Sequence, residues 1–146
     1  MAEPNQYLRL QLQGVQYLLP STSGFTIEQR EGLLANSDPA SPIVAWRAVR
    51  NARWPAYCLD TGLKPARRDD WSRAVFIEAT PHAIGLAVDD VHMLPRADTQ
   101  VGPFTPLGPA PTRHGHLFAG VWVTGRRVTL VFDPKALIGY LQGLGE

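Results

Sequence analysis

Hydrophobic and polar residues alternate with a period of two along most of the chain, which is the pattern of half-buried β-strands. The first such segment, residues 7–13, is separated by a turn at Gly14 from a second segment at residues 15–20. The pattern predicts further strands, rich in Val, Ile, Phe and Trp, at residues 43–50, 52–59, 73–80, 82–91, 120–123 and 127–133. Pro55 cannot donate a hydrogen bond to a ladder, so it marks a sheet edge or a bulge in its strand.

Three stretches break this alternation. Residues 21–41 are rich in Ser, Gly, Asn, Asp and Pro and are predicted as a loop, with one helical turn near residues 27–34. Residues 101–111 contain four Pro and two Gly and are predicted as an irregular crossing. Near the C-terminus, Asp133 and Pro134 fit the N-cap and first residue of a helix. Its apolar face comprises Leu137, Ile138, Leu141 and Leu144. About eight or nine short strands and one closing helix predict a mainly β protein of the barrel or sandwich type.

The composition limits the classes of partner that this domain is expected to bind. The chain has 146 residues, 14 basic and 13 acidic side chains and a formal net charge of +1. Near-neutrality removes the global electrostatic attraction that nucleic acid or an anionic membrane would supply. The apolar runs of the sequence are too short to cross a bilayer. Its single cysteine, Cys58, cannot form an internal disulfide. The sequence therefore predicts a cytoplasmic protein with no nucleic-acid partner and no direct membrane insertion.

Motifs for catalysis are absent from the sequence. It contains no nucleophile elbow, phosphate-binding loop, dinucleotide fingerprint or paired-cysteine motif, so neither an enzyme nor a cofactor is predicted. Cys58 lies between apolar neighbours in a predicted strand and is interpreted as a buried, inert thiol. Asp89 follows an apolar run at a strand end, where a carboxylate commonly fixes a turn. The alternative is a small metal-dependent enzyme that uses His114 and His116 as ligands.

Arginine and tryptophan concentrate in the middle of the chain. Arg47, Arg50 and Arg53 recur every three residues and are interleaved with Trp46 and Trp54. These residue types are enriched at the energetic centres of protein interfaces, but arginine stems also cover tryptophan rings on ordinary surfaces. Both interpretations remain open from the residues alone. Strand alternation predicts that Arg47 and Arg53 share one face and that Arg50 takes the other.

Three motifs, in order and spacing, resemble the CheW-like chemotaxis coupling proteins over about residues 6–141. Residues 7–20 resemble the family's opening hairpin, which ends in a Tyr-Gly-Ile-Pro-like element matched here by residues 17–20. Residues 83–91 resemble a central strand of the family, with Gly85, Val88, Asp89 and Val91 in place. Residues 117–138 match the closing hairpin and helix at Gly120, Gly125, Arg127, Asp133 and Leu137.

The resemblance implies one domain over residues 1–146, built from two pseudo-symmetric, interleaved five-stranded β-barrels with a C-terminal helix. It also implies a non-catalytic adaptor between the cytoplasmic tip of a chemoreceptor and the regulatory domain of a CheA-type histidine kinase, in chemotaxis or a pilus-type pathway. Arg50, with its neighbour Val49, matches the family's receptor-facing element, and Val91 and Leu94 match positions at the groove between the barrels.

The chain departs from the family within that receptor-facing element. Only the arginine is retained in residues 48–51, where Ala48 and Asn51 replace family residues, and Cys58 stands where the family has Asp. A diverged interaction module that regulates motility through another partner is therefore the second hypothesis.

Overall fold

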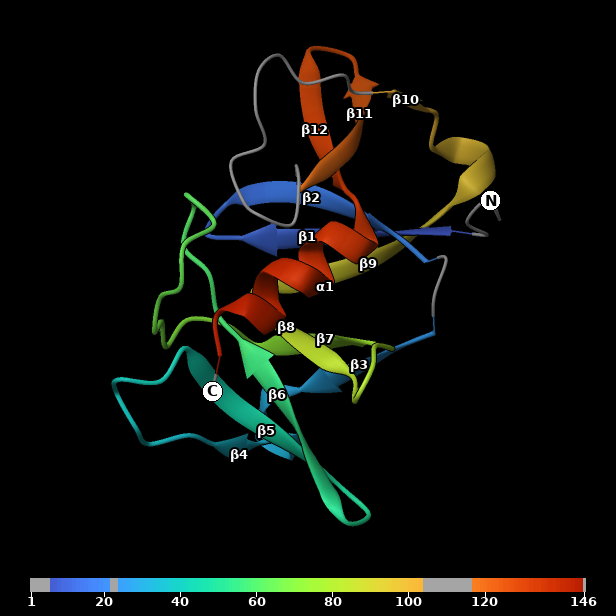
Figure 1. Cartoon of the computed structure of the whole chain (residues 1–146). Helices are drawn as coiled ribbons and strands as arrows, with labels where there is room; N and C mark the ends of the chain where they lie inside the picture. Colours follow the sequence, from blue (N-terminus) through green and yellow to red (C-terminus); the bar gives the residue numbers. More distant parts are fainter. Residues whose placement is uncertain (1–5, 22–23, 104–116, 146) are drawn as a thin grey trace.

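The computed structural model describes residues 6–21, 24–103 and 117–145 (Figure 1). Within these ranges the chain forms twelve strands, two 3-10 helices and one α-helix. The first six strands are β1 (Gln6–Leu12), β2 (Val15–Pro20), β3 (Phe25–Gln29), β4 (Leu34–Ala35), β5 (Ile43–Val49) and β6 (Ala52–Tyr57). The other six are β7 (Arg73–Ile77), β8 (Ile84–Val88), β9 (Asp90–Pro95), β10 (Val101–Pro103), β11 (Phe118–Thr124) and β12 (Arg127–Phe132). The helices are η1 (Arg30–Gly32), η2 (Arg96–Asp98) and α1 (Pro134–Gly143).

The strands form two six-stranded sheets of matching design (Figure 1). The terminal sheet has the order β10-β11-β12-β2-β1-β9, and the middle sheet has the order β4-β5-β6-β8-β7-β3. One pair of neighbouring strands in each sheet is parallel, β12 with β2 in the terminal sheet and β6 with β8 in the middle sheet. All other neighbouring pairs are antiparallel. Five strands of each sheet have five residues or more, and the sixth has two or three. The predicted fold, mainly β with two pseudo-symmetric halves and one C-terminal helix, is confirmed, and each half has six strands where five were expected.

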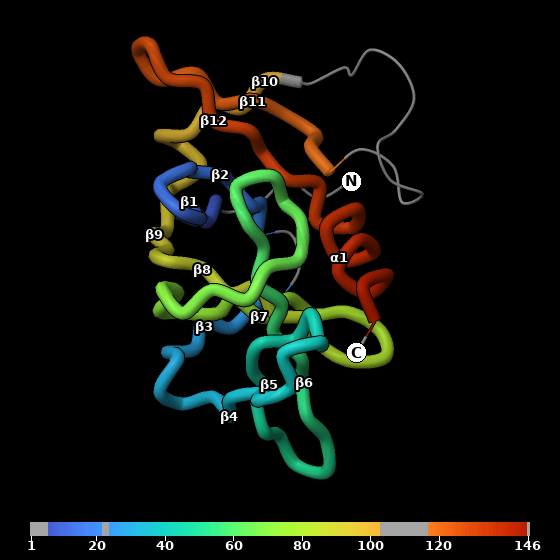
Figure 2. The backbone as a smooth tube through the Cα atoms, turned by 90° about the vertical axis from the view of Figure 1, so that its left-hand side faces the viewer, coloured from blue at the N-terminus to red at the C-terminus, as the bar shows by residue number. Residues whose placement is uncertain are grey.

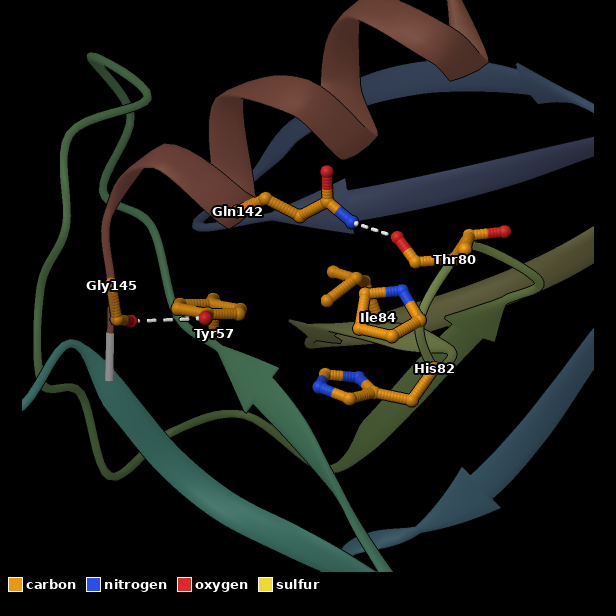
Figure 3. Close-up of a pocket in the computed structure, with 7 residues that line it drawn as sticks. Tyr57, Thr80, His82, Ile84, Gln142 and Gly145 are labelled. Atoms are coloured by element: carbon orange, nitrogen blue, oxygen red, sulfur yellow. Dashed lines mark hydrogen bonds between the residues drawn. The ribbon is translucent and has the colours of Figure 1, made fainter.

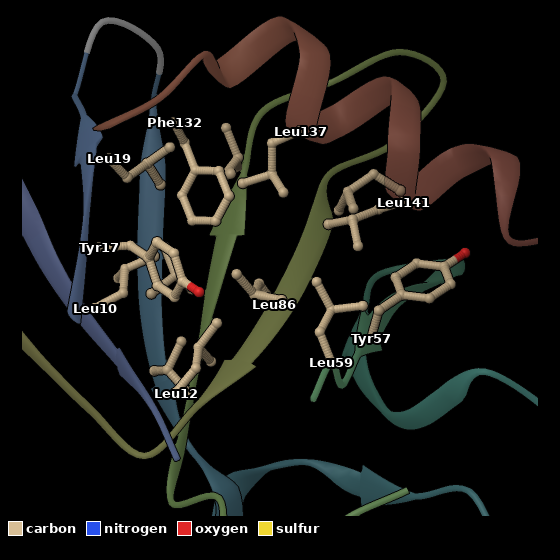
Figure 4. Close-up of a cluster of buried hydrophobic side chains, with 14 of the residues drawn as sticks. Leu10, Leu12, Tyr17, Leu19, Tyr57, Leu59, Leu86, Phe132, Leu137 and Leu141 are labelled. Carbon is tan, nitrogen blue, oxygen red and sulfur yellow. The ribbon is translucent and has the colours of Figure 1, made fainter. Parts of the chain in front are cut away.

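One hydrophobic core joins both sheets and α1 (Figure 4). Leu10 and Leu12 of the terminal sheet, Leu86 of the middle sheet and Leu137 and Leu141 of α1 all belong to it. The helix begins as the sequence predicts, because the Asp133 carboxylate accepts hydrogen bonds from the backbone N–H groups of residues 135 and 136. Since burying each such leucine stabilises a fold by about 1.5–3 kcal/mol, this shared core holds the two halves together.

Alternation along the middle sheet divides its side chains between two clusters. Val75 and Leu86 face the shared core, whereas Phe76 and Ala87 face a smaller cluster on the other side, which also contains Cys58. Both faces are therefore buried. Gly85 is required there, because a Cβ at this position would lie 2.6 Å from the Phe76 ring.

The predicted loop at residues 21–41 is partly wrong. Residues 25–29 form β3, which pairs along its whole length with β7, and residues 34–35 form the short β4. The helical turn expected within residues 27–34 is η1. β3 was missed because its pairing partner lies more than forty residues away in the chain, beyond the reach of local composition.

The predicted strand at residues 82–91 is two strands. β8 ends at Val88, and after Asp89 the chain enters β9, which pairs with β1 in the other sheet. Asp89 occupies the change of sheet and its carboxylate accepts a hydrogen bond from the Gln13 backbone N–H at 2.6 Å, so it fixes a turn as expected. Apolar residues resume at Val91 after two aspartates, so local composition does not show that the chain has changed sheet.

Pro55 lies in a strand that is internal to the middle sheet. The ladder between β6 and β8 contains only Ala56 and Tyr57, so Pro55 precedes it and pairs with Trp46 of β5 alone. At this position β6 has a pairing partner on one side only, as a strand at a sheet edge does, and proline is tolerated there. Of the predicted crossing at residues 101–111, residues 101–103 form β10 and the others lie outside the described residues.

Candidate functional site

The tip of the β5–β6 hairpin carries two of the predicted partner-binding residues. Val49 pairs with Ala52, and Arg50 and Asn51 form the two-residue turn between them. Asn51 has a φ of 63°, a left-handed conformation that asparagine adopts more readily than most residues. Arg50 is exposed, and no hydrogen bond or ion pair of its guanidinium is seen within the described part of the chain. This leaves its charge available to a partner.

The other arginines of this hairpin contact tryptophan rings. The guanidinium of Arg47 lies 5.0 Å from the centroid of Trp54 and is paired with Glu28 at 3.1 Å, and that of Arg53 lies 4.4 Å from Trp46. Cation–π contacts of this kind favour the surface-cover interpretation for these two arginines.

The predicted facing of Arg47 and Arg53 is wrong. Arg47 is opposite Trp54 in the ladder and Arg53 is opposite Ala48, so the two arginines lie on opposite faces of the hairpin. A two-residue turn pairs each odd-numbered residue of one strand with an even-numbered residue of the other. Arg47 and Arg53 are both odd-numbered, so they cannot share a face.

Val91 and Leu94, the other two predicted residues, lie on β9 in the terminal sheet. Val91 pairs with Leu10, is 5% exposed and belongs to the shared core, whereas Leu94 is partly buried. Met93 between them is the exposed apolar side chain of this strand. Because β9 and the β5–β6 hairpin belong to different sheets, the structure does not bring the four predicted residues together (Figure 2).

Sequence reasoning missed an apolar surface on the terminal sheet. Val123 and Val128 are directly opposite each other in the β11–β12 ladder and are 61% and 64% exposed. Val123 and Val128, two of the five exposed large hydrophobic residues in the described part of the chain, therefore form one row across two strands. We call it the valine row.

Two exposed arginines border the valine row. Arg126 lies in the two-residue turn of the β11–β12 hairpin, and Arg127 pairs with Thr124 at its base. Gly125, the other turn residue, has a φ of 60°, a conformation in which glycine is unstrained. The hairpin thus presents β-branched apolar side chains with a basic rim, which is a surface suited to a partner with apolar and acidic residues.

The corresponding hairpin of the middle sheet has different chemistry. By their places in the matched sheet orders, β11–β12 corresponds to β5–β6. Where the first hairpin carries Val123 and Val128, the second carries Ala48 and Arg53. The two hairpins project at opposite ends of the molecule (Figures 1 and 2), so the two ends present different side chains beside their turns.

A hollow of about 750 Å³ lies beside the β5–β6 hairpin. Its walls come from that hairpin and from the β7–β8 connection, and include Trp54, the exposed carboxylate of Glu78 and His82. A smaller hollow of about 270 Å³ shares the connection and reaches the end of α1 (Figure 3). There Tyr57 Oη donates a hydrogen bond to the Gly145 carbonyl at 3.0 Å, and Gln142 Nε2 donates one to the Thr80 carbonyl at 3.0 Å.

Arginines also fix the segment between β6 and β7. Arg67 Nη1 donates hydrogen bonds to the backbone carbonyls of Ser41 at 3.1 Å and Ile43 at 2.8 Å. The neighbouring Arg68 is only 7% exposed, and its Nη1 contacts carboxylates of Asp70 at 3.0 Å and Asp89 at 3.2 Å. Burial alone would lower the pKa of Arg68, but Cys58, Asp89 and Asp70 raise it, and the net shift is upward. These arginines therefore stabilise the fold.

The described residues hold no group of three or more His, Cys, Asp or Glu side chains placed to bind a metal ion. His114 and His116 lie outside the described residues, so the metal alternative is not tested. No α-helix in the described ranges combines the length and apolarity needed to cross a membrane.

The similarity of this chain to known proteins lies in its fold. No protein-family model matches the chain, and no curated protein sequence matches it. Among solved structures, the scaffolding protein TtCheW from Thermoanaerobacter tengcongensis superposes with a TM-score of 0.62, covering 89% of this chain and 89% of that chain at 20% identity.

The fold is CheW-like. At 20% identity the similarity establishes the architecture that the three sequence motifs predict. In this CheW-like fold the hairpin that carries Arg50 and the hairpin that carries the valine row are corresponding elements of the two halves.

Proposed function

We propose that the chain is a non-catalytic CheW-like adaptor, a single domain that links chemoreceptors to a CheA-type histidine kinase in the cytoplasm. The observation that carries the proposal is the fold shared with a scaffolding protein over nearly the full length of both chains. The two hairpin ends of the molecule support it, because an adaptor needs two surfaces of different chemistry for two partners.

Arg50 is the proposed contact to the receptor. Its guanidinium is exposed at a hairpin tip, where it can make a charge-assisted hydrogen bond to a carboxylate or a helix-end carbonyl. The adjacent hollow, with Trp54 and Glu78 in its walls, offers room for side chains of the same partner. Val49 supports the tip, and Val91 and Leu94 act through the packing of β9 because their side chains present little surface.

The valine row is the proposed contact to the kinase. A regulatory domain of the same fold would present strand ends of comparable shape, and burying Val123 and Val128 removes apolar side chains from water. Transient interfaces of this kind bury about 1,200 Å² or less in total. Multivalency in an array of many copies then supplies affinity that one contact lacks.

The test is a two-partner binding experiment with the full chain. The chain is immobilised and offered the regulatory domain of the CheA-type kinase from its own cell, the cytoplasmic tip of a chemoreceptor, and both together. The proposal expects each to bind alone and both to bind at once. Failure of both, with specific capture of another motility protein, would favour the diverged-module hypothesis. Stoichiometric metal in the purified protein would favour the metal-enzyme hypothesis.

A further inference from the structure

The hollow of about 750 Å³ beside the β5–β6 hairpin borders the smaller cluster of the middle sheet. Trp54 and Ala83 contribute both to its walls and to that cluster. The Trp54 ring packs on the ring of Phe76, with 6.3 Å between the ring centroids, and Glu78 follows Phe76 by two residues. Because side chains two residues apart in extended chain share a face, Glu78 lies on the face that carries Phe76. The hollow therefore has an indole and a carboxylate in its walls.

The Glu78 carboxylate lies against the backbone of Gly24. The Glu78 N–H donates a hydrogen bond to the Gly24 carbonyl at 2.9 Å, and a Cβ on residue 24 would lie 2.4 Å from the carboxylate. The carboxylate thus occupies space that a side chain at residue 24 would take. It is exposed and forms no salt bridge with another described residue, and no lysine or arginine lines the hollow. The hollow therefore presents a negative charge to an incoming ligand.

His82 adds a hydrogen-bond acceptor to the same walls. Its Nδ1 lies 3.1 Å from the Ala83 carbonyl, which can only accept a hydrogen bond, so Nδ1 is the donor. In the neutral ring this leaves Nε2 as an acceptor. A ligand that enters the hollow therefore gains most when it carries positive charge and several N–H donors.

The same face of the middle sheet already contains one arginine between a carboxylate and this tryptophan. The Arg47 guanidinium lies 5.0 Å from the centroid of the Trp54 ring and is paired with Glu28 at 3.1 Å. Glu28 neutralises Arg47, so Arg47 does not place an uncompensated positive charge beside the hollow. The hollow offers a second carboxylate, Glu78, with the same indole, and no arginine of the chain lines it.

We propose that this hollow receives an arginine side chain of a partner protein. The Glu78 carboxylate would accept two parallel N–H groups of the guanidinium, and the Trp54 indole would pack against the guanidinium group. Lysine carries a point charge on a flexible stem and matches this pair of groups less well. The assignment concerns the chemistry of the incoming residue and holds whichever protein supplies it, so it does not rest on the receptor being the partner.

A titration of the folded full-length chain with N-acetyl-arginine amide tests the proposal. The indole N–H resonance of Trp54, assigned by its loss in Trp54→Phe, reports on the hollow. One side chain is expected to bind with a Kd of millimolar order. N-acetyl-citrulline amide, which has nearly the same shape without the charge, and N-acetyl-lysine amide are expected to bind more weakly. A citrulline or lysine probe that binds as tightly as the arginine probe, or no saturable shift with arginine, overturns the proposal.

Variants of the carboxylate assign the binding to Glu78. Glu78→Gln is expected to weaken binding of the arginine probe by about threefold or more, because it removes the charge and leaves an amide of the same shape. Glu31→Gln changes another exposed carboxylate, in η1, and is expected to leave binding unchanged. Equal binding by Glu78→Gln and the wild type, or equal weakening by both variants, contradicts the assignment.

Gly24→Ala tests the position of the carboxylate while Glu78 remains in the chain. The new Cβ would displace the end of a flexible, exposed side chain, so we expect a melting temperature close to that of the wild type. Binding of the arginine probe is expected to weaken as in Glu78→Gln, because the carboxylate no longer lies against residue 24. Unchanged binding by a folded Gly24→Ala chain would show that this position does not matter and would overturn the proposed geometry.

Discussion

Val123 and Val128 lie directly opposite each other across the β11–β12 hairpin, and most of each side chain is exposed to solvent. Val128→Glu places a charge in the valine row. We expect binding of the kinase regulatory domain to fall at least about tenfold, while unfolding free energy changes by no more than about 0.5 kcal/mol, since the site is a surface. Surface plasmon resonance and urea unfolding measure the two effects.

Leu34→Glu is the matched control for the valine row. Leu34 is another exposed hydrophobic residue, on β4 of the other sheet. We expect this variant to bind the kinase domain as the wild type does. Equal weakening by both variants, or none by Val128→Glu, would show that the valine row is not the docking surface.

Arg50→Glu reverses the one arginine charge of the β5–β6 hairpin that lies at its tip. We expect receptor-tip binding to weaken at least about tenfold with the fold intact, because a charge-assisted contact becomes a repulsive one. Arg126→Glu makes the same change in the turn of the corresponding β11–β12 hairpin and should leave receptor binding unchanged. An unaltered receptor pull-down with Arg50→Glu would remove Arg50 from the proposed interface.

Gly85→Ala tests the packing of the middle sheet. The added Cβ would lie 2.6 Å from the ring of Phe76, which is itself buried, so we expect a loss of about 1–3 kcal/mol in unfolding free energy. Combining it with Phe76→Leu should recover part of the loss. Gly32→Ala, where a new Cβ meets nothing within 4 Å, is the control in the same urea titration. A neutral Gly85→Ala would mean that the ring moves aside freely.

Asp90 makes stability depend on pH at the acidic end. The backbone N–H of Val91 holds the pKa of this carboxyl below its ordinary 3.8, with His92 and Arg73 adding to the effect. A lowered folded-state pKa stabilises the protein above pH 3.8, and this stabilisation is lost as pH falls through the folded value. Wild type should therefore exceed Asp90→Asn in melting temperature at neutral pH, and the gap should narrow toward about pH 3. A gap that is constant with pH would contradict this.

Local patterns accounted for most of the strands and for the helix. Leu8, Leu10 and Leu12 alternate with polar neighbours and are all buried in β1, and Asp133 caps α1 with its carboxylate. These features depend on residues within a few positions of one another, so the sequence reveals them directly. The three motifs that resemble the CheW-like family predicted how these elements are arranged in the fold. The strands β3 and β9 were missed because their pairing is decided by segments distant in the chain.

The candidate surfaces were less accessible to sequence reasoning. Arg50 was found through a motif, and its exposure agrees with the proposed role. The valine row was missed because alternation marks valines in a strand but does not show how much of each side chain the folded protein leaves exposed. A search for strand valines flanked by turn residues would have found its members singly, without the register that joins them.

The sequence by itself determined that this protein is a weakly charged, mainly β domain with a capped C-terminal helix, because alternation, turn chemistry and capping are local. Only the tertiary structure decided which side chains act together. It placed Arg47 and Arg53 over tryptophan rings, buried the side chain of Arg68 and left Arg50 exposed at a hairpin tip. Such assignments depend on sheet register and on the burial of whole segments, which are set by contacts between residues far apart in the chain.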